Sequence, residues 1–157
     1  HDVHELNRLL IDALEKSLKG TGGQRLVPDL YKGTIANQTR CLNCETISER
    51  EETYYDLMLQ VNGIPDMMAS LLGYVSAERL DGDYKYACDS CGQRSAALRA
   101  QVLRQPLPPV LSVSLNRFKY DTTTWQRVKI NDKFDFPLLL DMQPFVEGAP
   151  YAGREAD

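Results

Sequence analysis

Two pairs of cysteines constrain this chain more than any other feature of its sequence. Cys41 and Cys44 form one C-x₂-C pair, Cys88 and Cys91 form the other, and the chain contains four cysteines in all. A C-x₂-C turn presents two thiolates to one ion, and two such turns complete a tetrahedral four-sulfur site. Four sulfur ligands favour zinc or iron. The spacing predicts a zinc ribbon with one knuckle per hairpin and a small subdomain between the knuckles.

The role expected for this zinc is structural, because four protein ligands leave no open coordination position for water or a substrate. Two disulfides are the first alternative, but disulfides are rare in cytosolic proteins and no signal peptide indicates secretion. A redox C-x-x-C is a weaker alternative, because neither pair opens a helix in a βαβ unit. We therefore expect one structural zinc ion as the cofactor.

Composition and charge exclude several classes of protein. The chain has 157 residues, 43% of them hydrophobic and 25% charged, which is ordinary for one globular domain. Its net charge of −4 disfavours a nucleic-acid binder and suits a partner with a basic surface. No apolar run approaches the roughly 18 residues of a membrane span. The chain begins without Met in a helical pattern, so we expect a piece of a larger protein.

The first twenty residues predict an amphipathic helix. Gly20 ends it, and apolar side chains repeat at helical spacing at Val3, Leu6, Leu10, Ala13, Leu14 and Leu18. Asp12 and Glu15 lie off the apolar stripe, on a face that is either solvated or in contact with a partner. His1 and His4 are three residues apart, whereas the H-E-x-x-H zinc motif needs a spacing of four. A metal site at this helix start is therefore the less favoured alternative.

Strand patterns dominate the rest of the chain, and the predicted fold class is α+β with mostly antiparallel strands. Residues 30–61 read as strands, with Tyr55, Leu57, Leu59 and Val61 on one face. A short helix follows Pro65, and residues 80–93 are rich in turns. Residues 95–105 are undecided between helix and strand. Residues 108–120 are the clearest strand, 122–132 a turn and return strand, and 134–145 an irregular apolar segment.

Five stretches in order resemble the ubiquitin-specific protease family. They are HDVHELNRLLIDALE, LYKGTI followed by the first cysteine pair, LDGDYKYACDSC, LPPVLSVSLNRFKYD and VKINDKFDFP. The resemblance extends to about Val146 and is greatest to the branch of the herpesvirus-associated ubiquitin-specific protease and its relatives. It implies a papain-like core shaped like a hand. Residues 1–31 would form the thumb helix and linker, 32–105 the zinc-ribbon fingers, and 106–157 part of the palm.

The same resemblance implies a thiol protease that cleaves after the C-terminal glycine of ubiquitin with a Cys-His-Asp/Asn constellation. Ubiquitin and ubiquitinated proteins would be the partners, in the cytoplasm, the nucleus or both. The family's catalytic Cys lies upstream of this chain's first residue, and its His and Asp/Asn lie downstream of the last. All four cysteines here belong to the zinc pairs. A thiol nucleophile needs a base within reach, so we expect the chain alone to be inactive.

The resemblance also implies which residues bind ubiquitin. Those expected to hold its arginine-rich C-terminal tail are Asp2, Val3, His4 and Glu5. Asp12 and Glu15 would meet its basic surface, and the palm residues expected to line the tail channel are Arg117, Phe118 and Lys129. His1 and His4 stand where Gln is usual, and their protonation below about pH 6.5 would add positive charge near a cationic tail. Alternatively, Arg117 pairs with an acid of the thumb and Phe118 belongs to the core.

Two other functions compete with the protease. One is a catalytically inactive, zinc-dependent scaffold that binds ubiquitin. The other is a zinc-ribbon nucleic-acid binder, which is disfavoured by the net negative charge and by the absence of a Lys/Arg cluster beside either knuckle. A Cys box and a His box on either side of this chain in the full-length protein would favour the protease.

Overall fold

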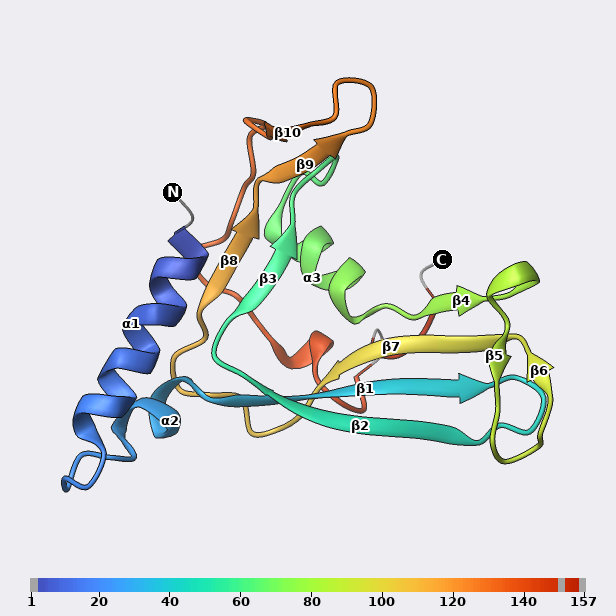
Figure 1. Cartoon of the computed structure of the whole chain (residues 1–157), viewed down its shortest axis with the longest axis horizontal. Coiled ribbons are helices and arrows are strands. Elements are labelled where there is room, and N and C mark those ends of the chain that lie inside the picture. Colours follow the sequence, from blue (N-terminus) through green and yellow to red (C-terminus); the bar gives the residue numbers. More distant parts are fainter. Residues whose placement is uncertain (1–2, 150–151, 156–157) are drawn as a thin grey trace.

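A long antiparallel sheet forms the base of the molecule in the computed structural model, which describes residues 3–149 and 152–155 (Figure 1). Its strand order is β2-β1-β7-β4, and the bounds are Gly33–Cys41 for β1, Ile47–Tyr54 for β2, Glu78–Leu80 for β4 and Ala97–Leu103 for β7. β1 pairs with β2 from Gly33 opposite Tyr54, and with β7 as far as Cys41 opposite Ala97. This pairing decides that the ambiguous segment 95–105 is a strand.

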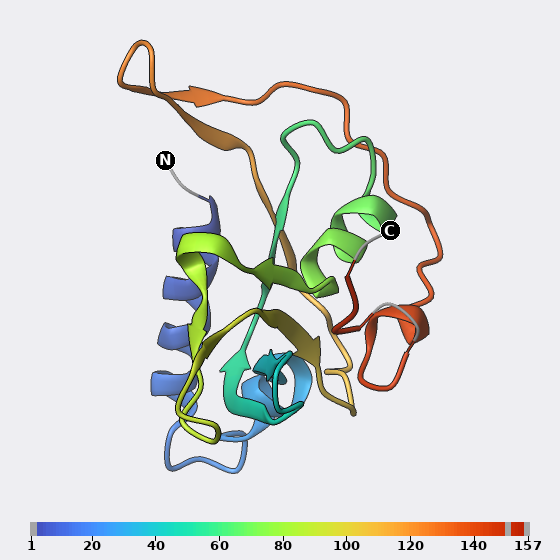
Figure 2. The same cartoon turned by 90° about the vertical axis from the view of Figure 1, so that its right-hand side faces the viewer.

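A second, smaller sheet is parallel, which the sequence pattern did not predict. β3 (Leu57–Gln60) pairs in parallel with β8 (Val113–Asn116), while the other strand pairs of the described chain are antiparallel. Helix α3 (Met67–Val75) packs beside β3, and the side chain of Asp66 caps it by accepting a hydrogen bond from the Ala69 N–H at 2.8 Å. Both views show the β3–β8 pair between α3 on one side and helix α1 (Val3–Leu18) on the other (Figure 1 and Figure 2).

The hydrophobic core joins the two sheets. Leu57 and Leu59 alternate inward from β3 and are fully buried, as the period-2 pattern predicts. The rest of the buried cluster comes from the long sheet, α3 and the C-terminal segment: Ile35, Tyr54, Leu71, Val75, Leu103, Phe145 and Val146. A smaller cluster contains Val61, Ile130 and Phe134.

Helix α1 (Val3–Leu18) has the predicted extent but packs through its polar side. Ile11 is its one buried residue among those described, whereas large apolar side chains at Val3, Leu6, Leu9, Leu10 and Leu14 are exposed. A short helix, α2 (Leu26–Tyr31), follows. Residues 30 and 31 therefore end a helix and do not begin the predicted strand. None of the helices in the described part of the chain is long and apolar enough to span a membrane.

The remaining elements are short. η1 (Gly82–Tyr84) precedes a small hairpin of β5 (Tyr86–Ala87) and β6 (Arg94–Ser95), at the far end of the long sheet. β9 (Phe118–Asp121) and β10 (Gln126–Lys129) form the predicted turn and return strand. The apolar segment from residue 134 is irregular, as predicted, and ends in η2 (Gln143–Phe145).

Gly33 begins β1 at a place where a side chain does not fit. A Cβ atom at Gly33 would collide with the ring of Tyr54, which lies directly opposite on β2. The Tyr54 ring is buried, and its burial raises the pKa of the hydroxyl to about 12. Glycine here lets a large aromatic ring cross the strand and cover its backbone. The ring thereby closes the corner at which β2 leads into β3.

Candidate functional site

The first cysteine pair lies in a tight turn between β1 and β2. The N–H of Cys41 donates to the Thr46 carbonyl at 3.0 Å, and the N–H of Glu45 donates back to the Cys41 carbonyl at 2.9 Å. Glu45 has a positive φ of 59°, a conformation that L side chains seldom adopt. The turn holds both sulfurs on one side of the chain.

The second pair repeats the same turn between β5 and β6. The N–H of Cys88 donates to the Gln93 carbonyl at 3.0 Å, and the N–H of Gly92 donates to the Cys88 carbonyl at 2.8 Å. Gly92 occupies the position equivalent to Glu45 and has a φ of 67°. Because glycine adopts a positive φ without steric cost, the backbone of the second turn is unstrained, whereas Glu45 strains the backbone of the first.

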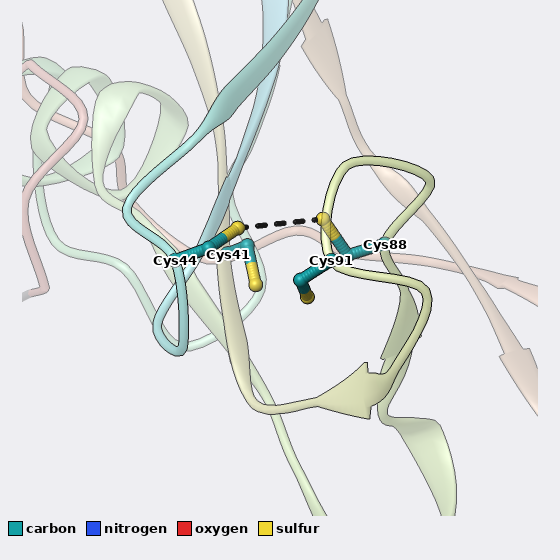
Figure 3. A group of neighbouring side chains, drawn as sticks. All are labelled: Cys41, Cys44, Cys88 and Cys91. Atoms are coloured by element: carbon teal, nitrogen blue, oxygen red, sulfur yellow. Dashed lines mark hydrogen bonds between the residues drawn. The ribbon is translucent and has the colours of Figure 1, made fainter.

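The two turns bring four sulfurs together (Figure 3). The ligand atoms of Cys41, Cys44, Cys88 and Cys91 all lie within 4.8 Å of one another, and all four thiols are free. Cys44 Sγ and Cys88 Sγ are 3.7 Å apart. A tetrahedral zinc site with Zn–S bonds of about 2.3 Å has sulfurs about 3.8 Å apart. The cluster fits a metal ion of that size, and disulfides are not formed.

The surroundings of Cys41 and Cys91 favour thiolates, whereas those of Cys88 do not: backbone N–H groups lower the pKa of Cys88, but burial and the neighbouring cysteine sulfurs raise it overall. Cys41 is fully buried and Cys88 is 5% exposed, while the other two are half-buried. A hydrogen bond from Ser95 lowers the pKa of Cys41 to about 6, together with backbone N–H groups of its own turn. The backbone of Gln93 and the side chain of Asn43 lower the pKa of Cys91. Because the thiolate is the metal-binding form, these contacts prepare the cluster for a cation.

Helix α1 carries most of the residues predicted to bind ubiquitin. Nε2 of His4 lies 2.7 Å from Oδ2 of Asp56, which also accepts a hydrogen bond from the Ser114 hydroxyl at 3.0 Å. The Asp56 side chain is 10% exposed. His4 therefore links α1 to β8 through a shared carboxylate. The predicted residues His1 and Asp2 lie outside the described residues.

The acids of α1 differ in what they contact. Glu15 accepts a hydrogen bond of 2.5 Å from the Tyr55 hydroxyl, and burial together with this bond raises the pKa of Tyr55 to about 12. Glu15 thus lies on a contact face within the chain. Asp12 is 55% exposed and pairs with Lys16, and Glu5 is exposed. A hollow of about 380 Å³ lies between α1 and the end of β2, and Asp12 and Glu15 are among the residues that line it.

The three predicted palm residues lie at the β9–β10 hairpin. Arg117 donates hydrogen bonds to the backbone carbonyl oxygens of Asp132 at 3.0 Å and Ile130 at 3.5 Å. These bonds are made to backbone groups and not to an acid of α1. Phe118 is 41% exposed and is therefore not a core residue. Lys129 pairs with Phe118 across the hairpin. Both views place the N-terminal end of α1 at the same end of the molecule as this hairpin.

Comparison with known proteins identifies the family. The family model described as ubiquitin carboxyl-terminal hydrolase matches residues 1–155. The chain belongs to the ubiquitin carboxyl-terminal hydrolase family. This confirms the resemblance to the ubiquitin-specific proteases, and the mixed helical and antiparallel fold with its four-cysteine cluster agrees with it.

Several named hydrolases match nearly the whole chain. Ubiquitin C-terminal hydrolase 12 of Arabidopsis thaliana is 42% identical over 157 residues, which are 100% of this chain and 14% of that protein. Ubiquitin carboxyl-terminal hydrolase 40 of Mus musculus is 43% identical over 150 residues, 94% of this chain and 12% of the mouse protein. Hydrolase 15 of Saccharomyces cerevisiae is 37% identical over 147 residues, with 94% and 12% covered. The chain therefore spans about a seventh or less of each relative.

Sequence reasoning missed three residues that organise the site of this chain. Tyr55 was placed in a strand face, but residues 55 and 56 are a bend between β2 and β3. Asp56 and Ser95 carried no motif. The sequence did contain one sign of the bend. Tyr54 and Tyr55 are adjacent aromatic residues followed by Asp56, and this pattern interrupts the alternation expected of a continuous strand. Nothing in the sequence marked Ser95.

The two equivalent turn positions predict stability changes of opposite sign. Gly92→Ala should destabilise the chain by about 1–2 kcal/mol, because Ala must adopt a left-handed conformation. No atom lies within 4 Å of the added Cβ, so the loss is conformational. Glu45→Gly should relieve the corresponding strain, and the exposed ion pair with Arg40 that it removes contributes little. Urea denaturation of both variants measures this, and destabilisation by Glu45→Gly as large as by Gly92→Ala would contradict it.

Proposed function

We propose that this chain is the ubiquitin-binding part of the catalytic domain of a deubiquitinating cysteine protease. The full-length protein would cleave the bond after the C-terminal glycine of ubiquitin. The observation that carries this proposal is the family match over residues 1–155, supported by relatives named as ubiquitin C-terminal hydrolases. Residues 1–31, 32–105 and 106–157 would serve as thumb, fingers and palm.

In this proposal the catalytic Cys and His are supplied by other parts of the full-length protein. All four cysteines lie in one cluster, so using one as the nucleophile would dismantle it. His4 is half-buried, lies 2.7 Å from Asp56 and belongs to α1, which lies at the opposite end of the long sheet from the β5–β6 hairpin (Figure 1). A nucleophile and its base must lie within hydrogen-bond reach of each other. The described residues offer no such pair.

The metal in the proposal is a structural zinc ion bound by Cys41, Cys44, Cys88 and Cys91. Zinc is preferred over iron because two C-x₂-C turns holding one tetrahedral set of thiolates are typical of structural zinc sites. Zinc would join the loop of β1–β2 to the loop of β5–β6. Binding energies of such sites are on the order of 10–16 kcal/mol and contribute directly to folding.

Metal analysis tests this site. The reduced protein should contain one zinc per chain, and Cys88→Ser should lose the metal because a ligand is removed. Ser90→Ala, which changes an exposed side chain of the same turn, should keep it. A folded protein that holds iron, or that holds no metal and forms disulfides between the pairs, would refute the assignment.

The proposed ubiquitin surface combines α1 with the β9–β10 hairpin. Asp2, Val3, His4 and Glu5 would hold the tail, with Arg117, Phe118 and Lys129 across the channel. Asp12 and Glu15 would face the basic surface of ubiquitin. The exposure of Glu5 and Phe118 supports this, because both are accessible to a partner. The bond between Glu15 and Tyr55 makes Glu15 the less available of the two later acids.

Substitutions on α1 should separate tail binding from surface contact. Glu5→Ala in the full-length protein should weaken ubiquitin binding about tenfold or more, because a hydrogen bond to a charged group in a narrow channel contributes about 1.5–3 kcal/mol. Asp12→Ala should weaken it only a few-fold, since exposed ion pairs contribute about 0.2–1 kcal/mol. Ubiquitin would be titrated against a form of the protein without its nucleophile.

Ubiquitin without its C-terminal tail is the control for this titration. Glu5→Ala should make little difference to tailless ubiquitin, because the contact that it removes is made to the tail. If the substitution weakens tailless ubiquitin equally, Glu5 supports the helix itself and the tail assignment is wrong.

Hydrolysis of a ubiquitin C-terminal amide distinguishes the protease from the alternative, a non-catalytic zinc-dependent ubiquitin-binding scaffold. The full-length protein should release the amide, and the 157-residue chain alone should not, because its cysteines are engaged at the metal site. Ubiquitin binding by the full-length protein without hydrolysis would establish the scaffold. Turnover by the chain alone that disappears on Cys91→Ser would show that the cluster is misassigned.

The proposal places the full-length protein in the cytoplasm, the nucleus or both, where ubiquitinated proteins are its substrates. Nucleic acid is not a proposed partner, because the net charge of the chain is −4. No membrane association is proposed.

A further inference from the structure

We propose that Ser95 is a positioning residue of the metal site, and that it hydrogen-bonds from the hairpin of the second cysteine turn to a sulfur of the first. The inference rests on the zinc site proposed above and adds a residue that neither C-x₂-C motif contains. Ser95 belongs to β6 and contacts Cys41.

Ser95 makes a close and well shielded contact with the first turn. Its Oγ lies 3.0 Å from Sγ of Cys41, across 54 residues of sequence. Cys41 is fully buried and Ser95 is half-buried, so little water competes for this bond. When Cys41 is a thiolate it has no proton to donate, and the Ser95 hydroxyl is then the donor.

Backbone pairing holds Ser95 in place. Ser95 lies opposite Tyr86 in the β5–β6 hairpin, and the adjacent Ala96 carbonyl accepts a hydrogen bond from the N–H of Leu42 at 2.9 Å. Leu42 is the residue after Cys41. Residues 95 and 96 therefore hold the second hairpin against the first turn, and this pairing places the Ser95 hydroxyl beside the Cys41 sulfur.

The physical role of the Ser95 hydroxyl follows from charge. Four thiolates around one divalent ion leave excess negative charge on the sulfurs, and hydrogen bonds to the sulfurs stabilise it. Partners outside the ligand set also fix the orientation of the ligands, and their loss typically weakens metal affinity by about 10–100-fold. Because Ser95 belongs to the second hairpin, that hairpin completes the surroundings of a ligand in the first turn.

Zinc competition measures the contribution of Ser95. The full-length protein with zinc bound would be titrated with a chromogenic chelator, and Ser95→Ala should raise the zinc dissociation constant about tenfold or more. Ser95→Thr keeps the hydroxyl and should restore most of the affinity. The matched control is Ser90→Ala, which removes an exposed hydroxyl from the second turn and should change the constant less than twofold.

Cobalt(II) substitution supplies a readout that a merely structural role would not change. Removing a hydrogen bond from a thiolate raises the energy of its sulfur electrons. Ser95→Ala should therefore shift the thiolate-to-cobalt charge-transfer band to longer wavelength, and Ser90→Ala should not.

The outcomes separate this inference from the zinc assignment. If the wild-type protein binds one zinc but Ser95→Ala binds it as tightly and leaves the cobalt band in place, the positioning role is wrong and the site stands. If Ser95→Ala and Ser90→Ala weaken zinc equally, the specific role of Ser95 is also wrong. If the wild-type protein binds no zinc, the site assignment fails and this inference fails with it.

Discussion

The antiparallel pairing of β1 with β7 is the interaction on which the rest of this structure depends. It aligns residues 35–41 with residues 97–103 and ends with Cys41 opposite Ala97. The first cysteine turn follows β1 directly, and the second lies in the hairpin just before β7. Two turns that are remote in sequence therefore meet at one end of the sheet. The opposite end of the same pairing carries Ile35 and Leu103 into the core.

Charged groups hold the edges of this sheet to their neighbours. The Arg104 guanidinium, which follows β7, contacts carboxylates of Glu49 and Glu51 on β2 and of Glu147 near the C-terminal segment. β2 is an edge strand, and its exposed side chains are rich in charge. Charge on an edge strand hinders pairing with other chains. The charged side chains of β2 thus protect the long exposed edge of the sheet from pairing with strands of other chains.

Polar contacts attach helix α1 to the body of the molecule, together with the buried side chain of Ile11. The carboxylate of Asp56 joins His4 and Ser114, and Glu15 accepts a hydrogen bond from the Tyr55 hydroxyl. These bonds are partly shielded from water, where hydrogen bonds to charged groups are stronger than at an open surface. His4 and Glu15, which belong to the proposed ubiquitin surface, therefore also fix the orientation of α1. Glu5 and Asp12 are exposed and lie outside this contact with Asp56 and Tyr55.

Local patterns in the sequence determined the cysteine pairs, the extent of α1 and the β9–β10 hairpin, because turn residues and side-chain periodicity act over a few positions. Tertiary structure alone decided the remainder. Residues 97–103 are a strand because β1 pairs with them, and β3 joins β8 in parallel although Leu57 and its partner Val113 are 56 positions apart in the sequence. The approach of Ser95 to Cys41 likewise depends on strand pairing between distant segments. Such contacts balance loop-closure entropy against burial and hydrogen bonding across the whole fold, and no short stretch of sequence records that balance.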